Sequence, residues 1–319
     1  MTSHRTPKTL VLLVLFFEIL CATAIAKPKT VIIVAADGTG DFKTVQQAID
    51  HVPDNNNERV VIQIKPGRYE EQIRVNSNKR LVTLRGEDLR NTVLTYRLSA
   101  QEAGNTRLAF STFINANDFR AENITFENSF GTGSQAVALL IDADRGSFIN
   151  CRFLGWQDTL FINGGRHFFK DCYIEGHVDF IFGSAKAFFE SCQIHSKGPG
   201  YITAHFRTSD DQQTGFVFYR CRLTGSDTGS GVYLGRPWRP FARVVFIECW
   251  MDSHIRAEGW DNWRDPAREK TAWFAEYDSK GPGANPKKRV GWSKQLSKAE
   301  AKMFSRSVFL DGNDHWTPN

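Results

Sequence analysis

Five short segments of the chain repeat one pattern: a phenylalanine, then a cysteine three residues later, then an apolar residue two further on. The copies begin at Phe148, Phe169, Phe189, Phe218 and Phe246, so their starts are 21, 20, 29 and 28 residues apart. Every cysteine except Cys21 occupies the same position of this pattern. A weaker copy begins at Ala121 and has Ile124 in place of the cysteine. Repeats of this length predict a stack of similar coils.

The spacing inside each copy predicts two strands joined by a sharp corner. The cysteine and the next apolar residue share one face of a strand, whereas the phenylalanine has the opposite parity. A bend restores the phase, and Asn123, Asn150 and Asp171 stand at the expected corner. Asn and Asp tolerate the left-handed conformation that such a corner uses. Strand, corner, strand and return are typical of a right-handed parallel β-helix, whereas leucine-rich repeats and propellers fit the pattern poorly.

The two ends of such a stack need caps. Residues 41–53 have apolar side chains at helical spacing, with Asp41 as the expected N-cap and Pro53 as the stop, which predicts a capping helix. From about residue 255 the repeat is lost, which predicts loops and a short helix near 298–304 packed along the stack. The tail contains five tryptophans that we interpret as packing residues: Trp260, Trp263, Trp273, Trp292 and Trp316.

The first 26 residues have the pattern of a secretory signal peptide. A basic start precedes an apolar run at residues 10–20, and residues 24–26 form a small-x-small cleavage site. The run is too short to span a membrane, although Glu18 within it leaves a retained anchor as the alternative. We therefore expect a secreted protein with one β-helix domain at residues 27–319 and no membrane contact after signal removal.

The charge balance is compatible with an acidic polymer outside the cell as the ligand but, taken alone, indicates only ordinary solubility. The chain carries a formal charge of +5, and removing residues 1–26, with two basic and one acidic residue, leaves about +4. A mildly basic secreted surface suits an acidic polysaccharide, although this charge is also ordinary for a soluble protein. The sequence has no basic run interleaved with aromatics, so we do not expect nucleic acid as a partner. It also has no histidine or cysteine spacing typical of a metal site.

The repeat aligns two aspartates on neighbouring coils. Asp158 lies seven residues after Cys151, and Asp179 lies seven residues after Cys172. Equivalent residues of adjacent coils lie about 4.8 Å apart, so the two carboxylates should be stacked between apolar neighbours. Such a pair repels unless a proton is shared, a cation intervenes or the environments differ. Because carboxylates with separated pKa values often perform acid–base chemistry, a catalytic role is favoured over a structural one.

Other polar and aromatic residues fall near the same face. Arg236, in the segment YLGRPW, is placed to pair with Asp179 through two hydrogen bonds and keep it ionised. Trp238, after a rigid proline, offers a flat surface to a sugar ring. Gln135 and Gln157 carry amide donors able to hold a developing oxyanion. Each of these residues taken alone also fits a surface or packing role.

These motifs resemble those of a known family. The segments GWQDTLF, GHVDFIFGSA, SQAVAL and YLGRPW are similar to the signatures of pectin methylesterases, which are right-handed β-helix enzymes. The likeness extends to DGTGDFKTVQQAID and KPGRYEEQI and covers roughly residues 30–316. The sequence departs from common plant members at Trp156, where they usually have tyrosine. This departure concerns the branch of the family and the processivity rather than the chemistry.

The resemblance implies a role for each candidate residue. Asp179 would be the nucleophile and Asp158 the general acid and then base. The remaining catalytic and substrate-lining residues implied are Gln135 and Gln157 in the oxyanion hole, Arg236 orienting the nucleophile, and Trp238, Phe161 and Phe182 along the sugar site. The implied substrate is methyl-esterified homogalacturonan in the cell wall, with no cofactor. We expect a monomer, and a protein inhibitor is a further candidate partner.

Two other functions stay open at this point. A β-helix polygalacturonase or lyase would cut the backbone of the same polymer, and stacked carboxylates about 5 Å apart also suit a retaining glycosidase. A non-catalytic solenoid that binds the cell wall is the second alternative. The glutamines favour ester hydrolysis over backbone cleavage, and the complete set of competent residues argues against a purely structural protein.

Two modifications can also be predicted from the repeat. Stacked coils place neighbouring cysteines within the Cα range of a disulfide, and we predict a Cys172–Cys192 bond. A Cys151–Cys172 bond and a row of free thiols are the alternatives. The sequon at Asn123 lies at a corner, where the asparagine serves the turn, so we expect low glycan occupancy.

Overall fold

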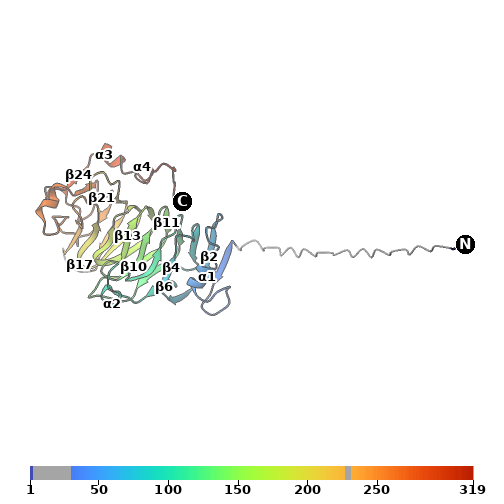
Figure 1. Cartoon of the computed structure of the whole chain (residues 1–319). Helices are drawn as coiled ribbons and strands as arrows, with labels where there is room; N and C mark the ends of the chain where they lie inside the picture. The colour runs from blue at the N-terminus through green and yellow to red at the C-terminus, as the bar shows by residue number, and fades with distance from the viewer. Residues whose placement is uncertain (3–29, 227–230, 319) are drawn as a thin grey trace.

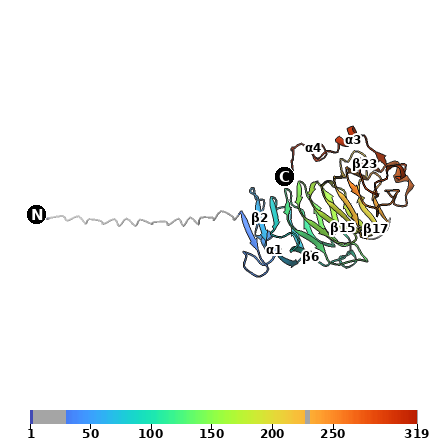
Figure 2. The same ribbon diagram turned by 180° about the vertical axis from the view of Figure 1, so that it is seen from behind.

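The chain folds into a right-handed parallel β-helix (Figures 1 and 2). This is a computed structural model, and it describes residues 1–2, 30–226 and 231–318. The predicted signal peptide, apart from its first two residues, lies outside the described residues. Within the described residues, no helix is long and apolar enough to cross a membrane.

One sheet of the described residues contains eleven strands that pair in parallel along the length of the molecule. In spatial order they are β1 (Val31–Val34), β2 (Val60–Ile64), β5 (Val82–Gly86), β8 (Arg120–Glu122), β11 (Gly146–Ile149), β14 (Arg166–Lys170), β16 (Lys186–Glu190), β18 (Gly215–Tyr219), β21 (Arg243–Ile247), β23 (Trp273–Tyr277) and β24 (Lys294–Gln295). Each successive strand comes from the next coil, so the order follows the sequence, as a solenoid requires.

The other thirteen described strands form two faces that join at two long strands, β15 (Tyr173–Gly183) and β17 (Gln193–His205). The face that follows the corners contains β3 (Gly67–Glu70), β6 (Thr92–Tyr96), β9 (Thr125–Asn128), β12 (Arg152–Leu154), β19 (Arg222–Gly225) and β22 (Trp250–Met251). The face that carries the candidate site contains β4 (Ile73–Val75), β7 (Phe110–Ile114), β10 (Val137–Asp142), β13 (Leu160–Gly164) and β20 (Val232–Pro237).

The repeated phenylalanines form a continuous stack inside the solenoid. Phe148, Phe169, Phe189, Phe218 and Phe246 are successive strand partners, and all five are fully buried. Their ring centroids lie 4.7, 4.7, 4.5 and 4.5 Å apart, with nearly parallel planes. The predicted repeat is therefore confirmed as the axis of the core. Stacked aromatic pairs add to the large apolar area that these rings bury.

The repeated cysteines form a second buried row, and all five are free thiols. The Sγ of Cys172 donates to the carbonyl oxygens of Lys170 and Phe148 at 3.3 and 3.4 Å. The predicted Cys172–Cys192 disulfide is therefore wrong, and the alternative of a thiol row is correct. In-register stacking keeps equivalent Cβ atoms about 4.8 Å apart with parallel side chains. A disulfide needs converging side chains with Cβ atoms about 3.5–4.5 Å apart.

The corners have the predicted left-handed conformation. Asn123, Asn150 and Asp171 have φ values of 55°, 49° and 53°. Ser191 and Arg220 take the same conformation on later coils, with φ values of 54° and 52°. The coil geometry therefore imposes the corner even where the residue type does not favour it. The Nδ2 of Asn150 donates to the Oδ1 of Asn123 at 2.7 Å, and the low glycan occupancy of Asn123 stays a prediction.

The N-terminal capping helix is α1 (Val45–His51), whose apolar side buries Val45, Ala48 and Ile49. Its N-cap is Thr44, which accepts a hydrogen bond from the backbone nitrogen of Gln47, so the predicted cap at Asp41 is wrong. Asp41 lies three residues too early, and its carboxylate accepts from the nitrogen of Ile33 instead. The other helices of the described residues are short: α2 (Ala100–Ala103), α3 (Lys298–Lys302), α4 (Arg306–Phe309) and the 3₁₀ turns at Pro266–Lys270 and Pro286–Lys288.

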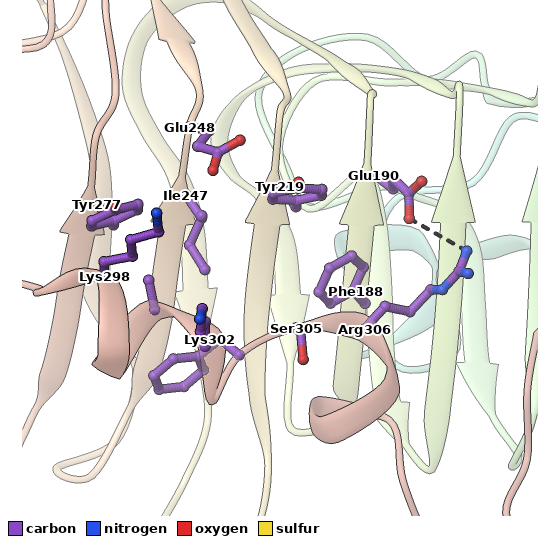
Figure 3. Close-up of a pocket in the computed structure, with 12 residues that line it drawn as sticks. Phe188, Glu190, Tyr219, Ile247, Glu248, Tyr277, Lys298, Lys302, Ser305 and Arg306 are labelled. Carbon is purple, nitrogen blue, oxygen red and sulfur yellow. Dashed lines mark hydrogen bonds and ion pairs between the residues drawn. The ribbon is translucent and has the colours of Figure 1, made fainter.

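The C-terminal segment crosses the outer face of the eleven-stranded sheet, as Figure 3 shows. Phe309 and Leu310 are buried there against Phe168 and Phe188. A cavity of about 370 Å³ remains between α3, α4 and the strands, and none of its lining residues lines the candidate site described below. Arg306 and Glu190 form an ion pair of 3.4 Å at its edge (Figure 3).

Candidate active site

The two aspartates lie on neighbouring coils in the predicted register. Strands β13 and β15 pair Phe161 with Phe182, whose ring centroids are 4.3 Å apart. Asp158 and Asp179 lie three residues before these rings, so they occupy equivalent places on the two coils. Both have left-handed backbones, with φ values of 65° and 51°. Non-glycine residues pay for this conformation in strain, which occurs preferentially at functional sites.

Arg236 makes the predicted ion pair with Asp179. Its Nε lies 2.9 Å from Oδ1 of Asp179 and its Nη2 lies 2.6 Å from Oδ2, which is a bidentate contact. The strand register explains how residues so distant in sequence meet: Phe182 pairs with Ala204 on β17, and Ala204 pairs with Arg236 on β20. Charge-assisted bidentate pairs are among the strongest hydrogen-bonded contacts in proteins.

The two carboxylates differ in their electrostatic environment. Asp158 and Asp179 are only 8% and 7% exposed, so burial opposes ionisation of both. Burial and the neighbouring charge of Asp179 raise the pKa of Asp158 well above its usual value. Burial also raises the pKa of Asp179, but hydrogen bonds from Arg236 and its positive charge act in the opposite direction. The net pKa of Asp179 is still raised, but that of Asp158 is raised well above its usual value, with no hydrogen bond from Arg236 to oppose burial.

The two aspartates lie at the bottom of a surface cleft of about 520 Å³. The cleft brings together all eight candidate residues of the sequence: Gln135, Gln157, Asp158, Phe161, Asp179, Phe182, Arg236 and Trp238. Aromatic rings form its apolar wall, with the Trp238 ring centroid 5.9 Å from that of Phe182 and 6.5 Å from that of Phe161. A concave site with apolar walls and few convergent polar groups is typical of ligand binding.

The two glutamines enter the cleft from adjacent coils. The backbone nitrogen of Ala136, next to Gln135, donates to the carbonyl oxygen of Gln157 at 3.1 Å. Ser134 Oγ lies 3.5 Å from the Oε1 of Gln135. Among the described residues, no acceptor pairs with the side-chain amide nitrogen of either glutamine. Two amide donors therefore face the same cleft as the carboxylates.

The structure adds residues to the site that sequence reasoning missed. Trp263, interpreted above as a packing residue, does pack against the aromatic wall of the cleft, and it also lines the cleft. Its ring and that of Tyr201 each lie 3.8 Å from the guanidinium carbon of Arg236. Trp263 follows the last repeat in an irregular loop, where no register predicts its position. Tyr201 is the strand partner of Val178, next to Asp179, and extending the coil alignment would have found it.

The remaining tail tryptophans pack as expected. Trp260 stacks on Phe274 at 4.4 Å, and Trp273 lies 5.1 Å from Phe304.

Asn105, Thr106 and Arg107 also line the cleft, from the segment after α2. In the part of the chain that the structure describes, no group of three or more histidine, cysteine, aspartate or glutamate residues is placed to hold a metal ion.

Comparison with known proteins agrees with this geometry. A family model described as Pectinesterase matches residues 31–313, nearly the whole described chain. The chain belongs to the pectinesterase family. Pectinesterase 31 of Arabidopsis thaliana is 46% identical over 289 residues, which cover 87% of this chain and 91% of that protein. Pectinesterase 1 of Olea europaea is 43% identical over 283 residues, with coverage of 86% and 76%.

Solved structures of pectin methylesterases are similar to this chain in fold as well as in sequence. A pectin methylesterase from carrot superimposes with a TM-score of 0.85 and 33% identity, covering 88% of this chain and 92% of that one. A pectin methylesterase in complex with a hexasaccharide superimposes with a TM-score of 0.78 and 30% identity, covering 90% and 98%. The protein is therefore an ester hydrolase that acts on the methyl esters of pectin, on the β-helix fold of its family.

Proposed function

We propose that this pectinesterase hydrolyses methyl esters of homogalacturonan with Asp179 as the nucleophile and Asp158 as the general acid and base. The observation that carries the assignment is the bidentate contact of Arg236 with one carboxylate of the buried pair and not the other. The paired carboxylate keeps its negative charge and can attack, while its neighbour keeps a proton to donate. The complex of a relative with a hexasaccharide supports an oligosaccharide as the ligand.

The first half of the reaction forms an acyl-enzyme. A carboxylate oxygen of Asp179 attacks the C6 carbonyl carbon of a methyl galacturonate unit, and the carbonyl oxygen becomes an oxyanion. The side-chain amides of Gln135 and Gln157 donate to that oxygen, and donors fixed at a developing charge accelerate such steps strongly. The carbon–oxygen bond to the methoxy group then breaks, and Asp158 gives its proton to the departing methanol.

The second half regenerates the enzyme. Asp158, now ionised, accepts a proton from a water molecule that attacks the acyl carbon. The bond to Asp179 breaks, which releases a galacturonic acid unit and restores the ionised nucleophile beside Arg236. The new carboxyl group then loses its proton to solvent. Trp238, Phe161 and Phe182 hold the sugar ring against the carboxylates by apolar contact.

The setting of the enzyme follows from the same interpretation. We place it outside the cell, in the plant cell wall, as a monomeric single domain at residues 27–319 after cleavage of the signal peptide. Its polymeric substrate cannot enter a closed pocket, and the open cleft on the side of a rigid solenoid fits a long chain. A protein inhibitor that covers this cleft is a further partner of the proposal.

Methanol release from methyl-esterified pectin, with viscosity followed in parallel, tests the assignment. Wild-type enzyme should release methanol without an early fall in viscosity. The Asp179→Asn variant should lose turnover by about three orders of magnitude or more, because an amide cannot attack the ester. Backbone cleavage, the alternative, would instead lower viscosity before methanol appears.

Asp278→Asn is the matched control. Asp278 has the same left-handed backbone, with a φ of 47°, but lies at an exposed corner outside the cleft. This variant should keep wild-type turnover. Near wild-type esterase activity in folded Asp179→Asn protein would show that the carboxylate pair is structural.

A further inference from the structure

A second row of residues runs across the coils on the face that follows the corners. Arg152, Tyr173, Gln193, Arg222 and Trp250 are successive strand partners on β12, β15, β17, β19 and β22. We call these five residues the outer row. At about 4.8 Å per coil, the row extends about 19 Å along the solenoid.

The side chains of the outer row face outward. The residue after each of them is fully buried in the core, as strand alternation requires: Phe153, Ile174, Ile194, Leu223 and Met251. Gln193 and Arg222 are exposed, and Trp250 is 43% exposed. At this exposure, Trp250 leaves part of its ring open to a ligand.

The two arginines of the row have no carboxylate partner within 4.0 Å among the described residues. Their guanidinium carbons lie instead near aromatic rings of the same row, 5.4 Å from Tyr173 for Arg152 and 6.0 Å from Trp250 for Arg222. The surface arginine Arg220, by contrast, is paired with Glu248 at 2.8 Å. The outer row thus presents uncompensated positive charge beside flat apolar surface.

One end of the row lies in a surface groove of about 540 Å³. Arg90 joins Arg152, Tyr173 and Gln193 in lining it, so two cations and a ring share one concave site. Asp171 is the only acidic side chain lining the groove within the described residues. None of these groups lines the cleft that holds Asp158 and Asp179.

We propose that the outer row binds a de-esterified, anionic stretch of homogalacturonan. Arginine pairs with the carboxylates that ester hydrolysis creates, and aromatic rings pack against the sugar faces. A methyl-esterified stretch is neutral and loses the ion pairs, so the row distinguishes product from substrate. The identity of the polymer rests on the proposed function, whereas the anionic and aromatic character of the row does not.

The row is placed to act together with the cleft. Tyr173 and Asp179 belong to the same strand, β15, six residues or about 20 Å apart. Both the row and the pair of aspartates run across the strands, along the solenoid axis. The row and the cleft lie on two faces that share β15, so a polymer with one de-esterified segment held on the row can reach the cleft with an esterified segment further along.

Binding of polygalacturonate to the double variant Arg152→Gln/Arg222→Gln tests the proposal. The dissociation constant should rise about tenfold at low salt, with a smaller difference at high salt, because exposed ion pairs are weak and screened. Lys287→Gln/Lys288→Gln removes the same charge from two exposed residues outside the row and should change the affinity much less. Equal losses in the two double variants would overturn the proposal, since they would reflect net charge alone.

Two further measurements complete the test. Trp250→Ala should weaken polygalacturonate binding by about fivefold and leave poly-glutamate binding unchanged, because only the sugar has faces for the ring. An equal effect on both polymers, or on neither, would contradict a sugar site.

Methanol release from a short methyl-esterified oligomer should stay at the wild-type rate in the row variants. If the wild-type enzyme releases no methanol from this oligomer, the proposed function is refuted, whereas the binding of an anionic sugar polymer by the row is not.

Discussion

At the scale of residues, Asp158 and Asp179 have similar backbones and similar burial but different neighbours. Only Asp179 makes hydrogen bonds with Arg236, which offset part of the cost of burying its charge. Asp158 has no such contact, and the charge of Asp179 adds to the effect of burial on its pKa. In the proposed mechanism, this one guanidinium distinguishes the nucleophile from the acid.

Asp158→Asn should abolish efficient turnover but stabilise the fold at neutral pH. The pKa of Asp158 is higher in the folded than in the unfolded state, so the folded protein binds the proton more tightly. Wild-type stability therefore falls as the pH rises from the unfolded pKa of Asp158, near 3.8, toward its folded pKa. The amide has no proton to lose. The gain in melting temperature over wild type should therefore be near zero at pH 3 and grow toward pH 7. A gain that is constant with pH would contradict a protonated Asp158.

Arg236→Ala should destabilise the protein by about 3 kcal/mol at pH 7, because it leaves a buried carboxylate without its partner. The loss should be smaller near pH 3.5, where a proton neutralises Asp179. Urea denaturation at both pH values measures the difference. The stability of Arg236→Lys, which keeps the charge but not the bidentate contact, should lie between those of the wild type and Arg236→Ala. An equal loss at both pH values would show that the guanidinium acts mainly by packing against Tyr201 and Trp263.

At the scale of elements, each coil repeats strand, left-handed corner and strand, and places equivalent side chains in straight rows. Phenylalanine and cysteine rows fill the interior, while the buried aspartate pair lines the cleft and the outer row faces outward. The same register that aligns Asp158 with Asp179 aligns Arg152 with Tyr173. The in-register stacking of neighbouring coils thus aligns both the core residues and the residues of the candidate sites.

The cysteine row should behave as five buried thiols. In native protein none should react with iodoacetamide within minutes, because burial raises the pKa of thiols such as Cys151 and Cys249 and excludes the reagent. After denaturation without reductant, peptide mapping should find all five of these cysteines alkylated. A pair that becomes reactive only after reduction would show a disulfide absent from this structure.

At the scale of the molecule, the solenoid carries the candidate active-site cleft on one face and its C-terminal tail on another. The tail is held at its end by Asp314, whose carboxylate contacts Arg166 at 2.6 and 2.7 Å and Arg145 at 3.2 Å. Hydrogen bonds from Arg166 lower the pKa of Asp314. The tail covers apolar side chains of the eleven-stranded sheet, including Phe168.

Asp314→Asn should loosen the tail without changing catalysis. Limited proteolysis should cleave residues 311–318 severalfold faster in the variant than in the wild type, while methanol release stays unchanged. Because the pKa of Asp314 is depressed in the folded state, the contact is present above its unfolded pKa and is lost as pH falls. The difference in cleavage should therefore shrink in acid or at high salt. Asp278→Asn is the control, and an identical effect there would exclude a specific tether.

The sequence alone determined those features that depend on local periodicity. The repeat predicted the β-helix, the corners at Asn123, Asn150 and Asp171, and the alignment of Asp158 with Asp179, because neighbouring coils of nearly equal length must stack in register. Family motifs added the remaining cleft residues. The predicted Cys172 disulfide and the predicted cap of α1 were wrong, because both depend on geometry that is finer than the repeat.

Only the tertiary structure decided the contacts made by irregular segments. Trp263 reaches Arg236 from a loop after the last repeat, and Asp314 reaches Arg166 from the far end of the chain. No period in the sequence relates such residues, because their positions depend on how loops of unequal length cross the solenoid. The coils are repeated and so predictable from one another, whereas each loop has a single path that packing against the finished coils selects.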